Sequence, residues 1–445
     1  MAFFCGSKII RNIFQSKKKS SKKAKKDLEI FKKIHQCGDE AIFKDLAILF
    51  QRISLSIQTK EDLPTFFEYE LSAFPPTLFD ANGMRKTINI EFYLNFNFIY
   101  DISPHINDYF VIDGCFLLQH IVWPAKTPVK HIINFFINYI VEHYSRKGCV
   151  VFDGYPESVD GRWYIKTAER QRKNIGREIE IYEDGIIDVA SDKFFNVTTN
   201  EVRLIHILCK KLNEAGFSTK IAEEDADALI VEMAMRYANE NYRTWIVGTD
   251  VELLTILTAR TQHLDNIFFL HQEKDFTFHV CSNQSFKYPQ LQCIVLFLHA
   301  FSGCNTTSSF LNKGKRALIK LFLKRKDLIL EAKKFYHTNT PMYEIAFSGI
   351  KIAQEFYGGK NRDITLNELR FRRFVKLSRK GLVKFESLPP TEGSVIQHAY
   401  RTYLQVQSWL GNKKRATDWG WYMRNGNLIP LHSDMPPFPQ ELEDY

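Results

Sequence analysis

"GCVVFD", residues 148–153, is a run of apolar residues that ends in an aspartate. "DYFVID" (108–113) and "RTWIVGTD" (243–250) have the same form, and "NIFFLH" (266–271) and "FTFHV" (276–280) are further short apolar runs. Such runs, separated by segments with helical periodicity, are typical of parallel strands that are covered on both faces. We therefore predict an α/β fold, with a parallel sheet, helices on both faces and a mostly helical C-terminal region.

Carboxylates recur at the predicted strand ends. Parallel strands joined by right-handed crossovers bring their carboxyl ends to one edge of a sheet, where ligands bind in open α/β folds. The stretch "IAEEDADALIVEMA" (221–234) adds two aspartates at the start of a predicted helix. The residues that we expect at this edge are Asp113, Asp153, Asp225, Asp227, Asp250 and Glu252.

So many carboxylates at one edge would repel one another unless cations neutralise them. Mg²⁺ and Mn²⁺ prefer oxygen ligands, and two such ions about 4 Å apart can activate water and stabilise the leaving oxygen of a phosphodiester. The simpler interpretation is structural, because Asp-Gly after a strand is a turn signal and acidic residues favour helix starts. Each aspartate alone is more typical of a turn or cap, whereas the threefold repetition favours a two-ion metal site.

Other chemistries are not indicated. The chain contains no G-x-G-x-x-G or G-x-x-x-x-G-K-[ST] nucleotide-binding loop and no G-x-S-x-G nucleophile motif. Its 8 cysteines form no C-x-x-C pair, which argues against a zinc ribbon or a disulfide framework. No apolar run reaches the roughly 18 residues of a membrane span, so we expect none. His120, His206 and His299 stand singly on apolar helices and are expected in the core or an interface.

Four stretches resemble a known family in their order and spacing: "CVVFDGYP", "EEDADALIVEMA", "VGTDVELLTIL" and "HAFSGCNTTSSFLNKGKRALIKLF". Over about residues 106–325 the chain is similar to the PIN-like superfamily, in particular to the flap endonuclease branch of structure-specific 5′ nucleases. From about residue 65 onward it also resembles a group of animal proteins with a PIN-like core that are often multicopy and tied to mobile elements. The resemblance implies a PIN-like Rossmannoid sheet.

The resemblance also implies roles for individual residues. Asp113, Asp153, Asp225, Asp227 and Asp250 match the family's metal-binding and catalytic acids. Glu252 and Asn305 fall where the family usually has aspartates, which implies a weakened site for the second ion. A helix–turn–helix-like element would grip the duplex backbone, and a basic region would lie over the scissile strand. The residues implied to contact phosphates are Lys313, Lys315 and Arg316 in the helix–turn–helix-like element. In the basic region they are Lys166, Arg170 and Arg172. A solvated helix face is the alternative for all six.

We expect the chain to divide into four parts. These are a basic tail with a leading helix (1–45), an N-terminal extension (46–105), the PIN-like domain with its basic helical element (106–330) and a helical, aromatic-rich region (331–445). The net charge of +9 is partly local, because the run Lys17–Lys26 is rich in lysine. Such a run is typical of a nuclear localisation signal, a nucleic-acid-binding arm or a solvated leader. We expect a nuclear or cytoplasmic location, with the lysine run favouring the nucleus.

Three functional hypotheses follow. The first is a nuclease that uses two Mg²⁺ or Mn²⁺ ions to hydrolyse branched or single-stranded DNA or RNA, weakened by Glu252 and Asn305. The second is a catalytically degenerate protein on the same fold, derived from a mobile element, that binds nucleic acid or protein. The third is a protein scaffold whose aromatic C-terminal module is the working part.

Overall fold

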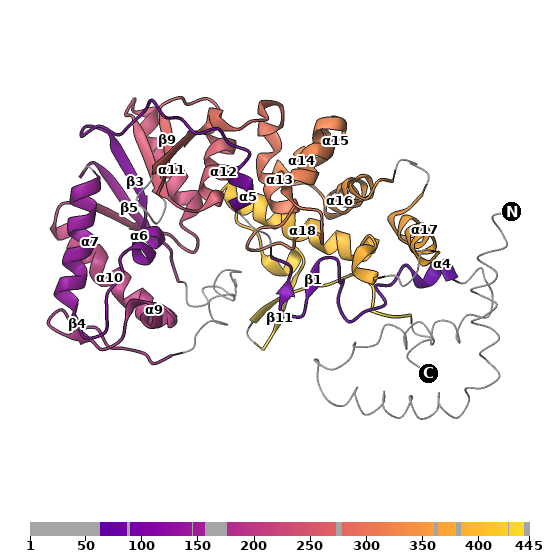
Figure 1. Ribbon diagram of the computed structural model, residues 1–445, viewed down its shortest axis with the longest axis horizontal. Helices are drawn as coiled ribbons and strands as arrows, with labels where there is room; N and C mark the ends of the chain where they lie inside the picture. The colour runs from indigo at the N-terminus through magenta and orange to yellow at the C-terminus, as the bar shows by residue number, and fades with distance from the viewer. Residues whose placement is uncertain are drawn as a thin grey trace.

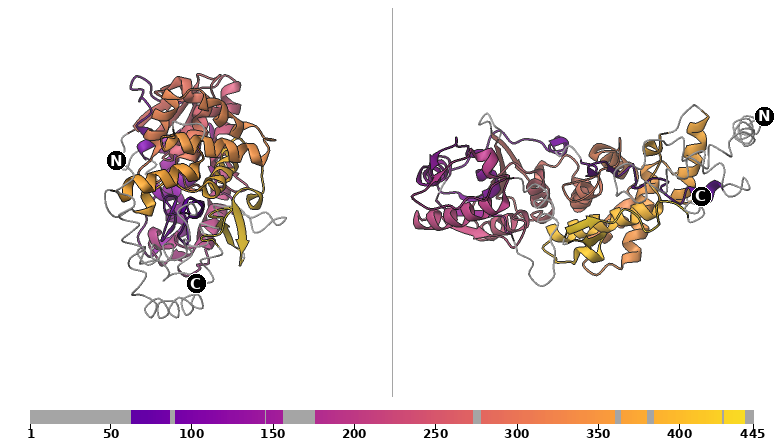
Figure 2. Two further views of the ribbon diagram at one scale, coloured as in Figure 1. Left: turned by 90° about the vertical axis from the view of Figure 1, so that its right-hand side faces the viewer. Right: turned by 90° about the horizontal axis from the view of Figure 1, so that it is seen from below.

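The computed structural model describes residues 63–86, 90–144, 146–155, 176–272, 278–359, 364–379, 384–425 and 427–439. The molecule is elongated, with an α/β part at one end and a helical part at the other (Figures 1 and 2). Two predictions, the lysine run Lys17–Lys26 and the basic region with Lys166, Arg170 and Arg172, lie outside the described residues. No helix within the described ranges is long and apolar enough to cross a membrane.

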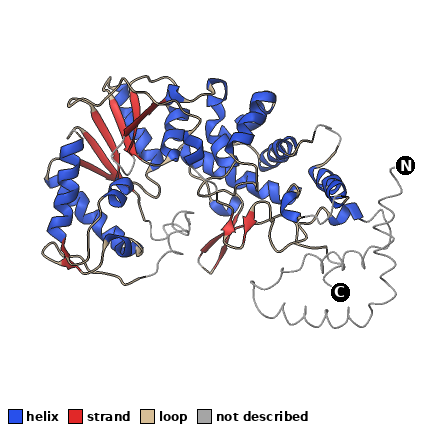
Figure 3. Ribbon diagram, viewed as in Figure 1, coloured by secondary structure: helices blue, strands red, loops and turns tan. Residues whose placement is uncertain are grey.

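A six-stranded sheet forms the centre of the α/β part, with the strand order β10-β9-β8-β3-β5-β7 (Figure 3). The strands are β3 (Tyr109–Asp113), β5 (Gly148–Phe152), β7 (Ser218–Ile221), β8 (Thr244–Gly248), β9 (Ile267–Gln272) and β10 (Phe278–Ser282). All neighbours are parallel except β10, which pairs antiparallel with β9. The five predicted strands are therefore confirmed. The predicted parallel sheet is confirmed for β9, β8, β3, β5 and β7, whereas β10 adds an antiparallel edge strand, and β7 was not predicted.

Helices cover both faces of the sheet, as predicted. Phe110 and Ile112 of β3 face one side, where they join a core with α6 (Gly114–His120), α7 (Val129–His143) and α10 (Thr198–Glu214). Val111 faces the other side, in a core that includes α11 (Asp227–Asn239) and α12 (Val251–Arg260). This alternation follows from the two-residue period of a strand, and burial on both faces explains the continuously apolar sequence of β3.

The strand order reverses next to β3. The chain runs from β3 outward through β5 to β7, and then returns to β8 on the opposite side of β3 before continuing to β9. A reversal of this kind leaves a crevice at the carboxyl ends of the strands, which is the usual ligand site of open α/β sheets. The ends of β3, β5 and β8 therefore define where a functional site is expected.

The C-terminal region is mostly helical, as predicted, and packs around one central helix. Its helices are α13 (Val295–Phe301), α14 (Lys315–Lys324), α15 (Leu328–Lys333), α16 (Met342–Phe356), α17 (Leu366–Ser378) and α18 (Glu392–Trp409). The central helix, α18, packs against α16, α13 and α11 and is buried along most of its length. One hydrophobic core runs from the sheet to α18, and the expected domain limit at 330/331 falls inside α15.

Short elements complete the fold. A hairpin of β11 (Trp421–Arg424) and β12 (Asn427–Pro430), which was not predicted, follows α18. The N-terminal extension contributes Leu78, Phe79 and Phe92 to the main core. The remaining helices and strands are α4 (Leu63–Phe66), β1 (Phe79–Asp80), β2 (Gly83–Met84), α5 (Ile90–Tyr93), β4 (Thr127–Pro128), β6 (Ile186–Ile187) and α9 (Ser191–Phe194). The described ranges also contain short 3₁₀ helices at Asn283–Ser285, Pro289–Ile294, Lys334–Tyr336, Phe385–Ser387 and Ala416–Asp418.

Candidate metal centre

Three carboxylates converge beside the carboxyl end of the sheet. Asp225 lies two residues before α11, Asp227 is the first residue of α11 and Glu252 lies in the first turn of α12. One oxygen of each lies within 4.8 Å of the others. Asp227 and Glu252 are buried and Asp225 is half-buried. Because buried carboxylates at this distance repel one another strongly, the arrangement fits a divalent cation with oxygen ligands.

Asp113 and Asp153 form a second acidic pair at the ends of the neighbouring strands β3 and β5. Asp113 Oδ1 accepts a hydrogen bond of 2.8 Å from the backbone N–H of Cys115, and so caps α6. Asp153 Oδ1 accepts one of 2.8 Å from the backbone N–H of Ala226, the residue before α11. This bond fixes the strand-end aspartate directly against the segment that carries Asp225 and Asp227.

Cys115 lies between the two aspartates and was not among the predicted site residues. Its Sγ donates to Asp153 Oδ2 at 3.1 Å. Burial and the charges of Asp153 and Asp113 raise the pKa of Cys115 well above its usual value, so the side chain remains a thiol. The sequence held no signal for this contact, which depends on how the first turn of α6 packs against β5.

The environment of Asp113 disfavours its negative charge. Burial, followed by the charge of Asp153, raises the pKa of Asp113 to about 7, against the lowering effect of the N–H groups of Cys115 and Phe116. The charge of Asp250 raises the pKa of Asp113 further. A bound cation would reverse this effect, because an opposite charge favours the ionised carboxylate.

Asp250 connects the two acidic groups. It caps α12 by accepting a hydrogen bond of 2.8 Å from the N–H of Glu252. Burial, then the charges of Asp250, Cys281 and Asp227, raise the pKa of Tyr93 well above its usual value, and the Tyr93 hydroxyl donates to the carbonyl of Thr249 at 3.0 Å. The structure thus places all five predicted aspartates at this end of the sheet.

A buried basic pair lies behind Glu252. Glu252 Oε1 is 4.0 Å from Nε2 of His299, and His299 Nδ1 is 3.1 Å from the ammonium of Lys315. Burial and the charge of Lys315 hold the pKa of His299 well below its usual value, so the ring is neutral. Since an ammonium can only donate, Nδ1 accepts and Nε2 carries the proton that faces Glu252.

Asn305 meets Glu252 through its backbone. The Asn305 N–H donates to Glu252 Oε1 at 3.5 Å, and Lys86 donates to the Asn305 carbonyl at 3.1 Å. The backbone of Asn305 is therefore in contact with the side chain of Glu252.

The implied phosphate contacts after Asn305 are only partly accessible. Lys315 is buried, with its ammonium also donating to the carbonyl of Gly303 at 2.5 Å, so the expectation of a phosphate contact at this residue has to be corrected. Lys313 is half-buried, donates to the carbonyl of Phe356 at 2.7 Å and lies 4.8 Å from the ring centres of Phe356 and Tyr357. Arg316 is exposed.

The three isolated histidines differ in their surroundings. His299 is buried, as expected of a core histidine, and His120 is half-buried. His206 lies exposed on α10, so of the two expected positions, core or interface, it does not occupy the core. Its neighbours Leu204, Ile205 and Leu208 supply the apolar face of this helix.

No protein-family model and no curated protein matches the chain. Solved structures that match include a mutant of the T5 5′-exonuclease (10% identity, TM-score 0.33, covering 67% of this chain and 87% of that chain). The T5 D15 protein co-crystallised with metal ions matches at 10% identity and a TM-score of 0.35, over 67% of this chain and 88% of its own. The bacteriophage T5 flap endonuclease in a pseudo-enzyme–product complex with DNA and metal ions matches at 11% identity and a TM-score of 0.34. The match covers 68% of this chain and 99% of that chain. At these TM-scores the likeness carries no argument about function, which rests on the geometry of the site.

Proposed function

We propose that the protein is a metal-dependent nuclease that hydrolyses phosphodiester bonds in DNA or RNA, branched or single-stranded. The observation that carries the proposal is the convergence of Asp225, Asp227 and Glu252, each with an oxygen within 4.8 Å of the others, at the carboxyl end of the sheet. The nearby pair Asp113 and Asp153 extends the acidic surface across the strand-order reversal.

The acidic residues are proposed to hold two Mg²⁺ or Mn²⁺ ions. The donor set consists of carboxylate oxygens, which these cations prefer, and it is partly buried, which strengthens attraction to a cation. Bound ions would supply Lewis-acid stabilisation and a water of lowered pKa. Asp225, Asp227 and Glu252 would hold one ion, and Asp113, Asp153 and Asp250 are the candidate ligands for the other.

Glu252 and Asn305 are proposed to weaken the site. The longer side chain of Glu252 shifts its carboxylate by one methylene, and magnesium demands near-ideal octahedral geometry. An asparagine at 305 supplies no negative charge. We therefore propose a nuclease with one well-held ion and one weakly held ion, and hence a slow reaction.

The test is cleavage of labelled flap, hairpin and single-stranded DNA and RNA in Mn²⁺. We expect Asp153→Ala to lower the cleavage rate by roughly a hundredfold or more, because metal-ion stabilisation contributes several kcal/mol. Asp192→Ala is the control, since Asp192 is exposed on α9 outside the acidic cluster. Cleavage that survives Asp153→Ala, or that continues in EDTA, would contradict the proposal.

A second candidate is a catalytically degenerate nucleic-acid-binding protein on the same fold. The observation that favours it is the contact of buried Glu252 with the backbone of Asn305, where the resemblance implies two aspartates. Metal-dependent binding of nucleic acid without any cleavage would support this alternative over the nuclease.

A further inference from the structure

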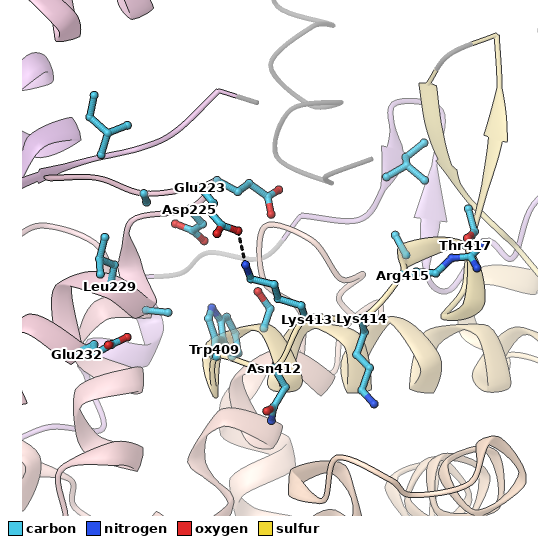
Figure 4. Close-up of a pocket in the computed structure, with 18 residues that line it drawn as sticks. Glu223, Asp225, Leu229, Glu232, Trp409, Asn412, Lys413, Lys414, Arg415 and Thr417 are labelled. Atoms are coloured by element: carbon cyan, nitrogen blue, oxygen red, sulfur yellow. Dashed lines mark hydrogen bonds and ion pairs between the residues drawn. The ribbon is translucent and has the colours of Figure 1, made fainter. Parts of the chain in front are cut away.

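A groove adjoins the metal centre on the side of the C-terminal region. It has a volume of about 380 Å³ and lies between the start of α11 and the end of α18 with its following loop (Figure 4). One wall carries the acidic residues Glu223, Glu224, Asp225 and Glu232, and the opposite wall carries Lys413, Lys414 and Arg415. Asp225 belongs both to this groove and to the acidic cluster, so a ligand in the groove would lie next to a bound ion.

The three basic residues differ in where they point. Lys413 extends across the groove and forms an ion pair with Glu223 (Figure 4). Lys414 turns away, because its ammonium donates to the carbonyl of Thr338 at 2.6 Å and lies 5.9 Å from the ring centre of Tyr403. Arg415 is exposed, 3.9 Å from Asp418.

The ion pair of Lys413 is well suited to exchange. Its side chain is 62% exposed and that of Glu223 is 69% exposed. Exposed pairs of this kind contribute little to stability, so a ligand with a stronger negative charge can displace Glu223 at low cost. A phosphate is such a ligand, and a cation held by Asp225 would offset the repulsion from the acidic wall.

We propose that this groove binds the phosphodiester backbone of a nucleic-acid strand beside the metal centre, with Lys413 contacting its phosphates. The proposal rests on the proposed nuclease function and names the path of its substrate strand. Lys414 has a different role, which is to fix the loop to the carbonyl of Thr338. Because the phosphate replaces Glu223 at Lys413, removing the charge of Glu223 should strengthen binding.

Fluorescence anisotropy with labelled single-stranded DNA and RNA tests the proposal. Ca²⁺ replaces Mg²⁺, so that binding is measured independently of cleavage. Each lost phosphate contact should reduce affinity about five- to eightfold at 0.1 M salt and lower the slope of log K against log salt by about 0.7 to 0.9. We expect this for Lys413→Ala. Glu223→Gln should raise the affinity severalfold.

Lys376→Ala is the control, because it removes one exposed charge on α17, whose residues do not line the groove. It should change affinity less than about twofold and leave the salt slope unchanged. Equal affinities and slopes for the wild type and Lys413→Ala would overturn the groove proposal while the nuclease proposal stands. If the wild-type protein binds no nucleic acid in the presence of divalent ions, both proposals fail.

Discussion

Asp113 is the residue whose environment depends most on whether a cation is present. Burial and the charge of Asp153 raise its pKa to about 7, well above the ordinary value of 3.8. The folded, metal-free protein therefore favours the protonated form. The contribution of Asp113 to stability is fully present below pH 3.8 and is lost as the pH rises through about 7.

The loss of this stabilising contribution at higher pH gives a prediction for the metal-free protein. In EDTA, the Tm should fall between pH 5.5 and pH 8 by more in the wild type than in Asp113→Asn, which cannot ionise at this position. Mn²⁺ should raise the wild-type Tm more at pH 8 than at pH 5.5, because ligands must lose their protons to bind a metal. Thermal melts at both pH values check this. If the two proteins change in parallel with pH, the buried Asp113 carboxyl is not the group responsible.

Asn305 gives the second prediction. Asn305→Asp adds a carboxylate beside Glu252, so the metal-free protein should become less stable while affinity for Mn²⁺ rises, on the order of tenfold. The cleavage rate should rise with it. Asn82→Asp, at an exposed turn, makes the same chemical change away from the cluster and should alter neither quantity. Mn²⁺ titration and cleavage assays measure these effects. An unchanged Mn²⁺ affinity and cleavage rate in Asn305→Asp would show that Asn305 does not weaken the site.

The place of the strand-end aspartates could be predicted, because each follows a short apolar run and the carboxyl ends of parallel strands meet at one edge of the sheet. Cys115 and the His299–Lys315 pair were not predictable, because their contacts depend on packing between distant segments. Lys315 illustrates the difference. In the sequence it is one of several basic residues, but it is the first residue of α14 and its side chain turns into the core.

Among the strands, the errors have identifiable causes. β7 has the sequence "STKI", lies at the edge of the sheet and is mostly exposed, so it lacks the apolar run that marked its neighbours. Only five residues separate β9 from β10, whereas a parallel crossover needs a dozen or more, so the antiparallel pairing could have been inferred. The Asn425-Gly426 dipeptide is likewise a hairpin signal, and β11 and β12 flank it.

The contact between the end of β5 and the segment before α11 gives a third prediction. Gly154 donates its N–H to the carbonyl of Glu224 at 2.7 Å, and a Cβ at this position would lie 1.9 Å from the carbonyl oxygen of Ala222. Gly154→Ala must therefore push the two segments apart and break the bond from Ala226 to Asp153. We expect a loss of about 3 kcal/mol in the free energy of unfolding, the upper end for overpacking, and at least about tenfold weaker Mn²⁺ binding.

Gly314→Ala is the control for this change, because the nearest atom to a Cβ there is Glu91 Oε2 at 3.9 Å. As an N-cap substitution it should cost no more than about 1 kcal/mol and leave Mn²⁺ affinity unchanged. Denaturant unfolding and metal titration measure both effects. Wild-type Mn²⁺ affinity in Gly154→Ala would show that the β5–α11 contact does not position the acidic cluster.

The largest hydrophobic core of the described residues is shared by the sheet and the helical region, which the sequence did not reveal. Val111 and Ile246 of the sheet belong to the same buried cluster as Tyr403, Val406 and Trp409 of α18. We expected a limit at residue 330, after the basic helical element, but a pattern along the chain does not report which apolar faces meet. The continuity matters for function, because α18 and the loop after it form one wall of the groove beside the metal centre.

This shared core predicts that the helical region and the metal centre unfold together. α16 and α18 approach closely at Gly349, where a Cβ would lie 2.5 Å from Cβ of Ala399. Gly349→Val should therefore separate the helices, lower the free energy of unfolding by about 1 to 3 kcal/mol, and shift the transitions seen by tryptophan fluorescence and by Mn²⁺ binding to the same lower temperature. Phe347→Ala, on the exposed face of α16, should shift neither by more than about 0.5 kcal/mol. Metal binding that persists after the fluorescence transition would show two separately folding parts instead of one.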